Sequence, residues 1–122
     1  MENSQDLAAF VRGHIPSVWA LELLLLLRSQ PGRCWPSALL VRELRASARL
    51  VDEILARFQQ SGLAVEEAEG WRFAPATPWL DTLTAKLADM YRERPVATMN
   101  LISRSDLLQS LADAFKLKGD GT

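Results

Sequence analysis

The stretch that decides the fold is residues 36–73, PSALLVRELRASARLVDEILARFQQSGLAVEEAEGWRF. Ser47 is a residue type that caps helix N-termini, and Gly62 is the type that ends helices. The apolar residues between them recur at helical spacing, which predicts one buried face. The expected elements are a helix, a turn, a helix and two short β runs: Pro36–Leu44, Arg45–Ser47, Ala48–Ser61, Leu63–Val65 and Trp71–Phe73.

Upstream of this stretch the sequence predicts two helices. Ser4–Arg12 forms a short helix that Gly13 stops, and Ser17–Ser29 forms a longer one. The second is apolar almost all round, so it must be packed on several sides. Trp35 is expected to lie on a short strand that pairs with the strand of Trp71.

Downstream, Thr77 and Pro78 are a strong helix start, with a cap followed by proline at the first helical position. This helix is expected to reach about Glu93, to bury Trp79 along its apolar face, and to end at Pro95. Residues 96–102 are predicted to be extended or irregular. A capping box of Ser103 and Asp106 then predicts a last helix, to about residue 117.

The order of elements from about Ser17 to Phe73 resembles the winged helix-turn-helix superfamily, through a Leu-rich helix, two helices around the turn at residues 45–47, and a β-ribbon. The expected fold class is therefore mainly α with a small β-ribbon. The resemblance divides the chain into an N-terminal arm or short helix (1–16), a winged helix-turn-helix core (17–74) and a C-terminal helical extension (75–122).

The resemblance implies that the helix at residues 48–61 enters the major groove of duplex DNA, while the ribbon touches the backbone or the minor groove. Between residues 28 and 57 six arginines stand against three acidic residues. We call the turn at residues 45–47, with Arg42, Arg45 and Arg49 around it, the basic turn. We expect the basic turn and the outward helix face to bind phosphates and bases. The candidate DNA-binding residues are Arg42, Arg45, Ser47, Arg49, Arg57, Gln60 and Arg72.

Acidic residues in the same stretch oppose this interpretation. Asp52 and Glu53 lie on the outward helix face, and the ribbon tip carries Glu66, Glu67 and Glu69. Carboxylates repel phosphate, and most affinity for DNA comes from phosphate neutralisation. The arginines could instead be solvated and paired with neighbouring acids.

The C-terminal segment presents apolar surface that a winged domain does not need for its own core. It can cover the Leu-rich helix, or it can pack on a second copy and form a homodimer. We expect a homodimer. The candidate dimer or partner interface is Leu101, Leu107, Leu108, Leu111 and Phe115.

Bulk properties exclude several classes of function. The net charge is −1, unlike that of a protein that coats nucleic acid. The longest apolar run, Val18–Leu27, is about half the length that spans a bilayer, so a cytoplasmic protein without a membrane partner is expected. The lone cysteine, Cys34, is either a redox sensor or a small apolar residue; the lone histidine, His14, is a surface or capping residue rather than a catalytic base.

No catalytic, metal or cofactor site is expected, because one histidine and one cysteine do not make a zinc site and no phosphate-binding loop is present. The function expected from the sequence is a small, dimeric transcriptional regulator that binds DNA. The alternative is a winged-helix module that binds protein through its acidic wing or its C-terminal helix. A small-molecule sensor is a third, more distant candidate, because no polar groups visibly converge on an apolar pocket.

Overall fold

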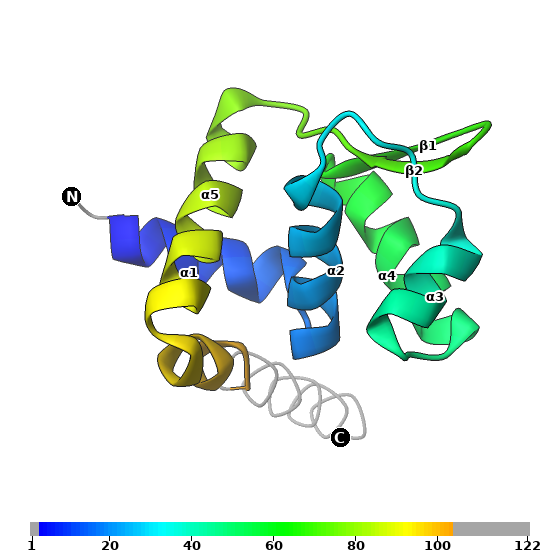
Figure 1. The fold of residues 1–122 in the computed structure, drawn as a ribbon. Coiled ribbons are helices and arrows are strands. Elements are labelled where there is room, and N and C mark those ends of the chain that lie inside the picture. The colour runs from blue at the N-terminus through cyan, green and yellow to red at the C-terminus, as the bar shows by residue number, and fades with distance from the viewer. Residues whose placement is uncertain (1–2, 104–122) are drawn as a thin grey trace, which may run out of the picture.

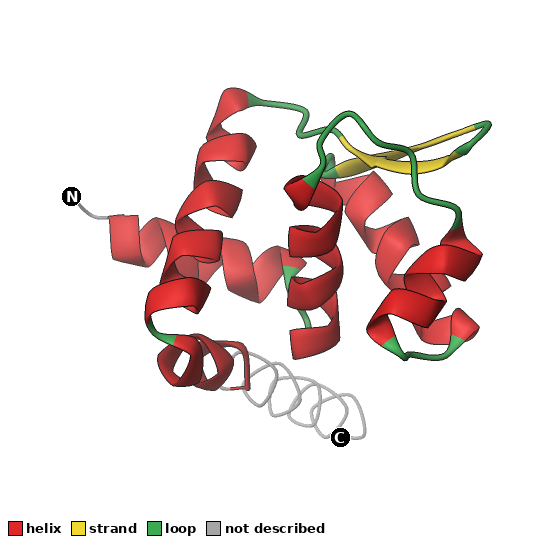
Figure 2. Ribbon diagram, in the orientation of Figure 1, coloured by secondary structure: helices red, strands yellow, loops and turns green. Residues whose placement is uncertain are grey.

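The computed structural model describes residues 3–103, a mainly helical chain with one small antiparallel sheet (Figures 1 and 2). A further helical stretch, residues 95–103, follows the last labelled element. The labelled elements are α1 (Asn3–His14), α2 (Val18–Ser29), α3 (Ser37–Leu44), α4 (Ala48–Ser61), β1 (Ala64–Glu67), β2 (Gly70–Phe73) and α5 (Pro78–Glu93).

The turn between α3 and α4 forms where the sequence predicts it. Arg45 ends α3 in the left-handed conformation, with φ 55° and ψ 41°. The Ser47 hydroxyl accepts a hydrogen bond from the Leu50 N–H at 3.1 Å, which caps α4. At the other end Gly62, with φ 76°, returns its N–H to the carbonyls of Gln59 and Phe58. Local capping chemistry therefore fixes both ends of α4.

A single core joins the helices to the hairpin. α2 stands between α5 and α3 in Figure 1 and buries five residues, four of them leucines. The amphipathic face of α4 and residues of α1 and α5 complete the core. Phe10 and Val11 of α1 and Ile15, directly after α1, are all almost fully buried. The N-terminal segment is thus part of the core, where it contacts both α4 and α5.

The hairpin is extended by a third, very short segment. β1 and β2 pair antiparallel, with Ala64 opposite Phe73 and Glu67 opposite Gly70. Trp35 forms a bridge with Trp71 through two backbone hydrogen bonds of 2.8 Å each. This pairing confirms the one expected for the two tryptophans. The Arg33 guanidinium lies 3.8 Å from the centre of the Trp35 ring.

Three predictions of secondary structure are wrong: the end of the first helix, the end of β1, which reaches Glu67 instead of Val65, and the extended conformation of residues 96–102. Gly13 does not stop α1, which continues to His14 because Val11 and Ile15, on either side of the glycine, are buried and the Ile15 N–H bonds to the Val11 carbonyl at 2.9 Å. Tertiary burial here outweighs the roughly 1 kcal/mol preference against glycine in a helix.

Residues 96–102 are helical rather than extended or irregular. Proline lacks an N–H and fits the first turn of a helix, so Pro95 begins this helix. Thr98 and Ile102, four residues apart, are buried, whereas Val96 is exposed. The buried residues are thus spaced as on one face of a helix.

The tryptophans divide into two pairs. Trp35 and Trp71 are buried, but Trp79 is 48 % exposed and Trp19 is 43 % exposed. The expectation that the helix from Pro78 buries Trp79 is therefore wrong: this side chain stands in the first turn of α5, ahead of the buried Leu83 and Leu87.

Of the candidate interface residues, Leu101 is half-buried against the core. Leu107, Leu108, Leu111 and Phe115 lie outside the described residues. In the described part, no single helix has the length and apolar content to cross a bilayer. The pair Gln5–His14 and Val18–Ser29 passes that test together but is bent by 102°.

Candidate nucleic-acid interface

The outward face of α4 carries the polar residues that the sequence predicts. Val51, Ile54, Leu55 and Phe58 are buried, so the opposite side of the helix faces solvent. Arg49, Asp52, Glu53, Ala56, Arg57 and Gln60 are all exposed. The candidate major-groove face is therefore accessible and rigidly backed by the core.

Three arginines surround the turn that leads into this helix. Arg42 lies in the last turn of α3, Arg45 is in the turn, and Arg49 is in the first turn of α4. All three are exposed. Within residues 3–103 neither Arg42 nor Arg45 forms an ion pair. These two guanidinium groups are thus available to an external anion.

Arg49 has an acidic neighbour on its own helix. Its Nε lies 3.2 Å from a carboxylate oxygen of Glu53, one turn further along α4. The two side chains are 89 % and 61 % exposed, and such exposed pairs contribute little, about 0.3–0.5 kcal/mol. Arg49 can leave Glu53 for a stronger partner at little cost.

Arg57 is directed toward α1. Its Nη2 donates a hydrogen bond to the carbonyl of Gly13 at 3.3 Å. That contact links α4 to the end of α1, and it directs the Arg57 guanidinium toward α1 instead of the basic turn. Gln60 is exposed near the end of α4, and Ser47 is engaged as the helix cap. Arg57 thus lies on α1 in this structure, whereas the Ser47 oxygen accepts the cap hydrogen bond and its O–H can still donate to a phosphate.

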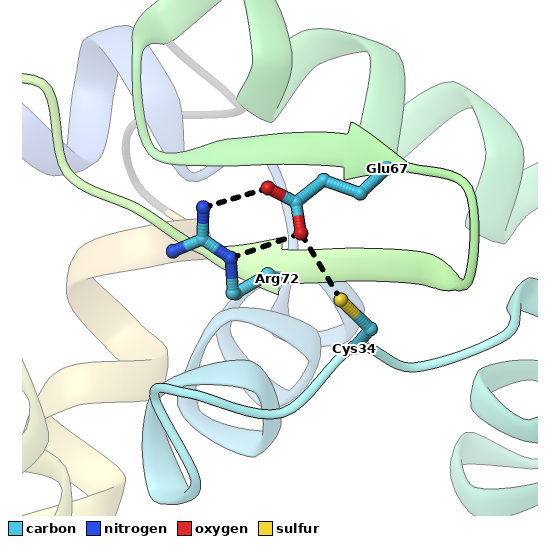
Figure 3. A network of polar contacts seen from close by, with 3 residues as sticks. All are labelled: Cys34, Glu67 and Arg72. Atoms are coloured by element: carbon cyan, nitrogen blue, oxygen red, sulfur yellow. Dashed lines mark hydrogen bonds and ion pairs between the residues drawn. The ribbon is translucent and has the colours of Figure 1, made fainter.

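The ribbon arginine is held by an acidic residue of the same ribbon (Figure 3). Arg72 donates from Nε and Nη2 to the two carboxylate oxygens of Glu67, at 3.3 and 2.9 Å. The Cys34 thiol donates to the same carboxylate at 3.2 Å. We call Cys34, Glu67 and Arg72 the ribbon network. Sequence analysis missed it because it depends on the register of the two strands.

The ribbon network fixes the chemistry of Cys34. The hydrogen bond to Glu67 raises the pKa of the thiol, and the nearby carboxylates add to the effect. Arg72, followed by Cys34, lowers the pKa of Glu67. Reactive redox cysteines have a lowered pKa, because the thiolate is the nucleophile. The thiol of Cys34 is therefore held in its protonated, less reactive form.

Glu67→Gln is expected to make Cys34 react faster. Glutamine removes the negative charge that disfavours the thiolate, so the thiol pKa falls and the thiolate fraction at neutral pH rises. The measurement is the rate of iodoacetamide alkylation between neutral and alkaline pH. Glu66→Gln, one residue away and outside the network, is the matched control. Equal rates in both variants would show that Glu67 does not govern the thiol.

A second contact that sequence analysis missed joins the ends of α1 and α4. The Nδ1 atom of His14 lies 3.0 Å from the Ser61 hydroxyl, across 47 residues of sequence. His14 is half-buried beside the Phe10 ring. A pocket of about 260 Å³ is lined by His14 and Trp79 but not by Ser61. This hydrogen bond links the last residue of α1 to the last residue of α4.

The pKa of His14 is lowered, first by burial and then by the charge of Arg57. The imidazole of His14 consequently takes up a proton more readily in the unfolded chain than in the folded chain. The free energy of unfolding is expected to fall as the pH drops below the ordinary value of 6.5, until the folded histidine is also protonated. Urea unfolding at several pH values, from about 7.5 to about 5, measures this slope.

His14→Asn is the matched variant for this slope, because the amide can occupy the place of Nδ1 without titrating. Its stability should vary less with pH over the same window. If the slopes of both proteins coincide, proton uptake by His14 does not set the acid sensitivity.

Comparisons with known proteins add no relative. A scan against family models, a search of curated proteins and a search of solved structures each return no match. Among the described residues, no group of three His, Cys, Asp or Glu side chains is placed to hold a metal ion. Any function must therefore be argued from the surface itself.

Proposed function

We propose that residues 17–74 form a winged helix-turn-helix domain and that the chain is a small transcriptional regulator that binds duplex DNA through the start of α4 and the turn before it. The observation that carries the proposal is the exposed set of Arg42, Arg45 and Arg49 around that turn. In helix-turn-helix proteins the N-terminal part of the second helix contacts base edges.

The element order supports the domain assignment. α2, the Trp35 segment, α3, α4, β1 and β2 follow one another as the helices and strands of a winged domain do, and Trp35 bridges to Trp71 on β2. In this proposal Arg42 and Arg45 bind phosphates, while Arg49 reaches guanine and Gln60 reaches adenine or phosphate. Asp52 and Glu53 would limit which bases the helix face accepts.

The ribbon has little part in this interface. Arg72 is neutralised by Glu67, and two more acidic residues are exposed, Glu66 on β1 and Glu69 in the turn. Arg57 is committed to α1. Three arginines therefore remain from the five in the candidate set. For duplex DNA the logarithm of affinity falls with the logarithm of salt with a slope of about −0.9 per phosphate neutralised. With Arg49 on a base, the two phosphate contacts of Arg42 and Arg45 predict a slope of about −1.8, whereas five arginines on phosphates would give about −4.5.

The test is the fluorescence anisotropy of a labelled mixed-sequence duplex over a series of salt concentrations. We expect Arg42→Ala to weaken binding and to reduce the slope by about 1, the value for one phosphate contact. Arg92→Ala, an exposed arginine on α5, should change neither quantity. No binding at the lowest salt, or equal losses in both variants, would overturn the proposal.

A homodimer belongs to the same proposal, with Leu101 and the apolar residues after Ser103 as its interface. Light scattering coupled to size exclusion measures the mass directly. A monomer at all concentrations would leave the C-terminal apolar residues as cover for the protein's own core.

A second candidate is a module that binds protein rather than DNA. It is favoured by the acidic ribbon tip and by the exposed Trp19. A pocket of about 310 Å³ is lined by Trp19, Val18, Leu44, Glu22 and Glu43. Acidic side chains around an exposed aromatic fit a basic, partly apolar partner. This candidate predicts no affinity for DNA at any salt concentration.

A further inference from the structure

A cleft of about 760 Å³ opens where three segments meet, away from the basic turn. Its walls come from the end of α2 and the turn after it, from the end of β2 and the connector that follows, and from the first turn of α5. Volumes of about 300–1,000 Å³ are those of small-molecule sites. The cleft is thus large enough for a small ligand.

The cleft holds two opposite charges that do not neutralise each other. Arg28, half-buried in the last turn of α2, and Asp81, in the first turn of α5, both line it. Neither residue forms an ion pair with any other part of residues 3–103. Each charge suits the helix end on which it lies. The interaction of each charge with its helix dipole does not, however, explain why both charges line the same cleft without an ion-pair partner in residues 3–103.

The third charge in the cleft, Arg72, is already neutralised. Glu67 accepts hydrogen bonds from its Nε and Nη2 atoms. The charges that remain for a ligand are one cation, Arg28, and one anion, Asp81. A ligand that satisfies both carries a carboxylate and an ammonium group.

Most of the remaining lining is apolar. Phe73, Pro31, Ala74 and Pro75 contribute to the walls, and Ser29 adds one hydroxyl. We propose that this cleft binds a small zwitterion with an apolar side chain, the chemistry of an apolar amino acid, whose carboxylate meets Arg28 and whose ammonium meets Asp81. This site is separate from the basic turn, so the inference does not rest on DNA binding.

The experiment titrates the full chain with three probes and follows backbone amide shifts of Gly32, Phe73 and Asp81 by NMR. L-Phenylalanine carries both charges, 3-phenylpropanoate lacks the ammonium, and 2-phenylethylamine lacks the carboxylate. Phenylalanine is expected to saturate these shifts and to bind at least about tenfold more tightly than either analogue, since each analogue leaves one charge of the cleft unpaired.

Two variants assign the charges. Arg28→Gln should weaken phenylalanine binding by about tenfold and leave the affinity for 2-phenylethylamine unchanged. Asp81→Asn should weaken phenylalanine binding similarly and leave the affinity for 3-phenylpropanoate unchanged. Arg33→Gln is the control, because Arg33 stacks on Trp35 and does not line the cleft. Melting temperatures of all variants show whether they remain folded.

Three outcomes would overturn the inference. Equal affinities for all three probes would show that binding does not require both charges. Shifts that do not saturate would show no site at all. Variants with lower melting temperatures but unchanged phenylalanine affinity would assign Arg28 and Asp81 to helix stability alone.

Discussion

Gly70→Ala is expected to lower the free energy of unfolding by about 3 kcal/mol, the largest effect of any substitution considered for this chain. Gly70 begins β2 with φ 137°, a conformation that is essentially confined to glycine. An added Cβ would also collide with the Trp35 carbonyl and lie 2.7 Å from the Pro36 nitrogen. Both neighbours are backbone atoms, so no side chain can move aside.

The collision falls on the bridge that joins the Trp35 segment to the hairpin. Trp35 and Trp71 exchange both of their backbone hydrogen bonds there. Relieving the clash would break this exchange and expose two buried indole rings. We therefore expect the loss of near-ultraviolet tryptophan dichroism together with a lower urea midpoint.

Gly32→Ala is the matched control for Gly70→Ala. A Cβ at Gly32 meets no atom within 4 Å, and its φ is not positive. Its unfolding free energy should stay within about 0.5 kcal/mol of the parent value. Equal stability of the two variants would show that the hairpin can move away from the Trp35 segment without loss.

Arg45→Gly is expected to make the protein more stable and a weaker DNA binder. Arg45 is the only described non-glycine residue with a positive φ. Glycine adopts this conformation without the Cβ penalty, so the variant should gain about 1 kcal/mol. The same change removes a guanidinium from the basic turn, which should weaken binding to the duplex by about tenfold and reduce the salt slope by about 1.

Arg45→Lys separates the two effects. Lysine retains the charge and the strain, so stability should be unchanged and most of the affinity should remain, since phosphate binding needs the charge more than the guanidinium fork. Urea unfolding and anisotropy measure both quantities on the same samples. A glycine variant that is more stable but binds DNA as tightly as the parent would remove Arg45 from the interface.

Opposite signs for stability and binding are what strain at a functional position predicts. A turn selected for stability alone would favour glycine at this position. The arginine at φ 55° is therefore an independent argument for a role of its side chain.

Local signals in the sequence predicted the structure best. The caps at Ser47, Gly62 and Thr77 act within a few residues, so their outcome depends little on the rest of the fold. The buried face of α4 could also be predicted, because the spacing of apolar residues within this one helix indicates it. Gly13 was misjudged because burial of its neighbours Val11 and Ile15 outweighs the local preference of glycine. At Pro95 the stop of α5 was expected, but the start of a new helix at the same proline was not.

The candidate site was harder to predict, because charges are paired by tertiary structure. The exposed arginines of the basic turn could be placed from periodicity. The pairing of Arg72 with Glu67 requires the strand register, and the direction of Arg57 requires the position of α1. The cleft between Arg28 and Asp81 joins residues more than fifty positions apart. The spacing of residues in the sequence does not indicate that Arg28 and Asp81 line one cleft, so the candidate small-molecule site could not be predicted.

The contact between α1 and α5 has a consequence for the order of events during synthesis. α1 emerges from the ribosome before α5, which helps to cover it and is made after the whole of the hairpin. Until then Phe10, Val11 and Ile15 lack part of their final surroundings, and the nascent chain exposes apolar surface that can engage chaperones. The helices around the basic turn, which are neighbours in sequence, can meet well before that final closure.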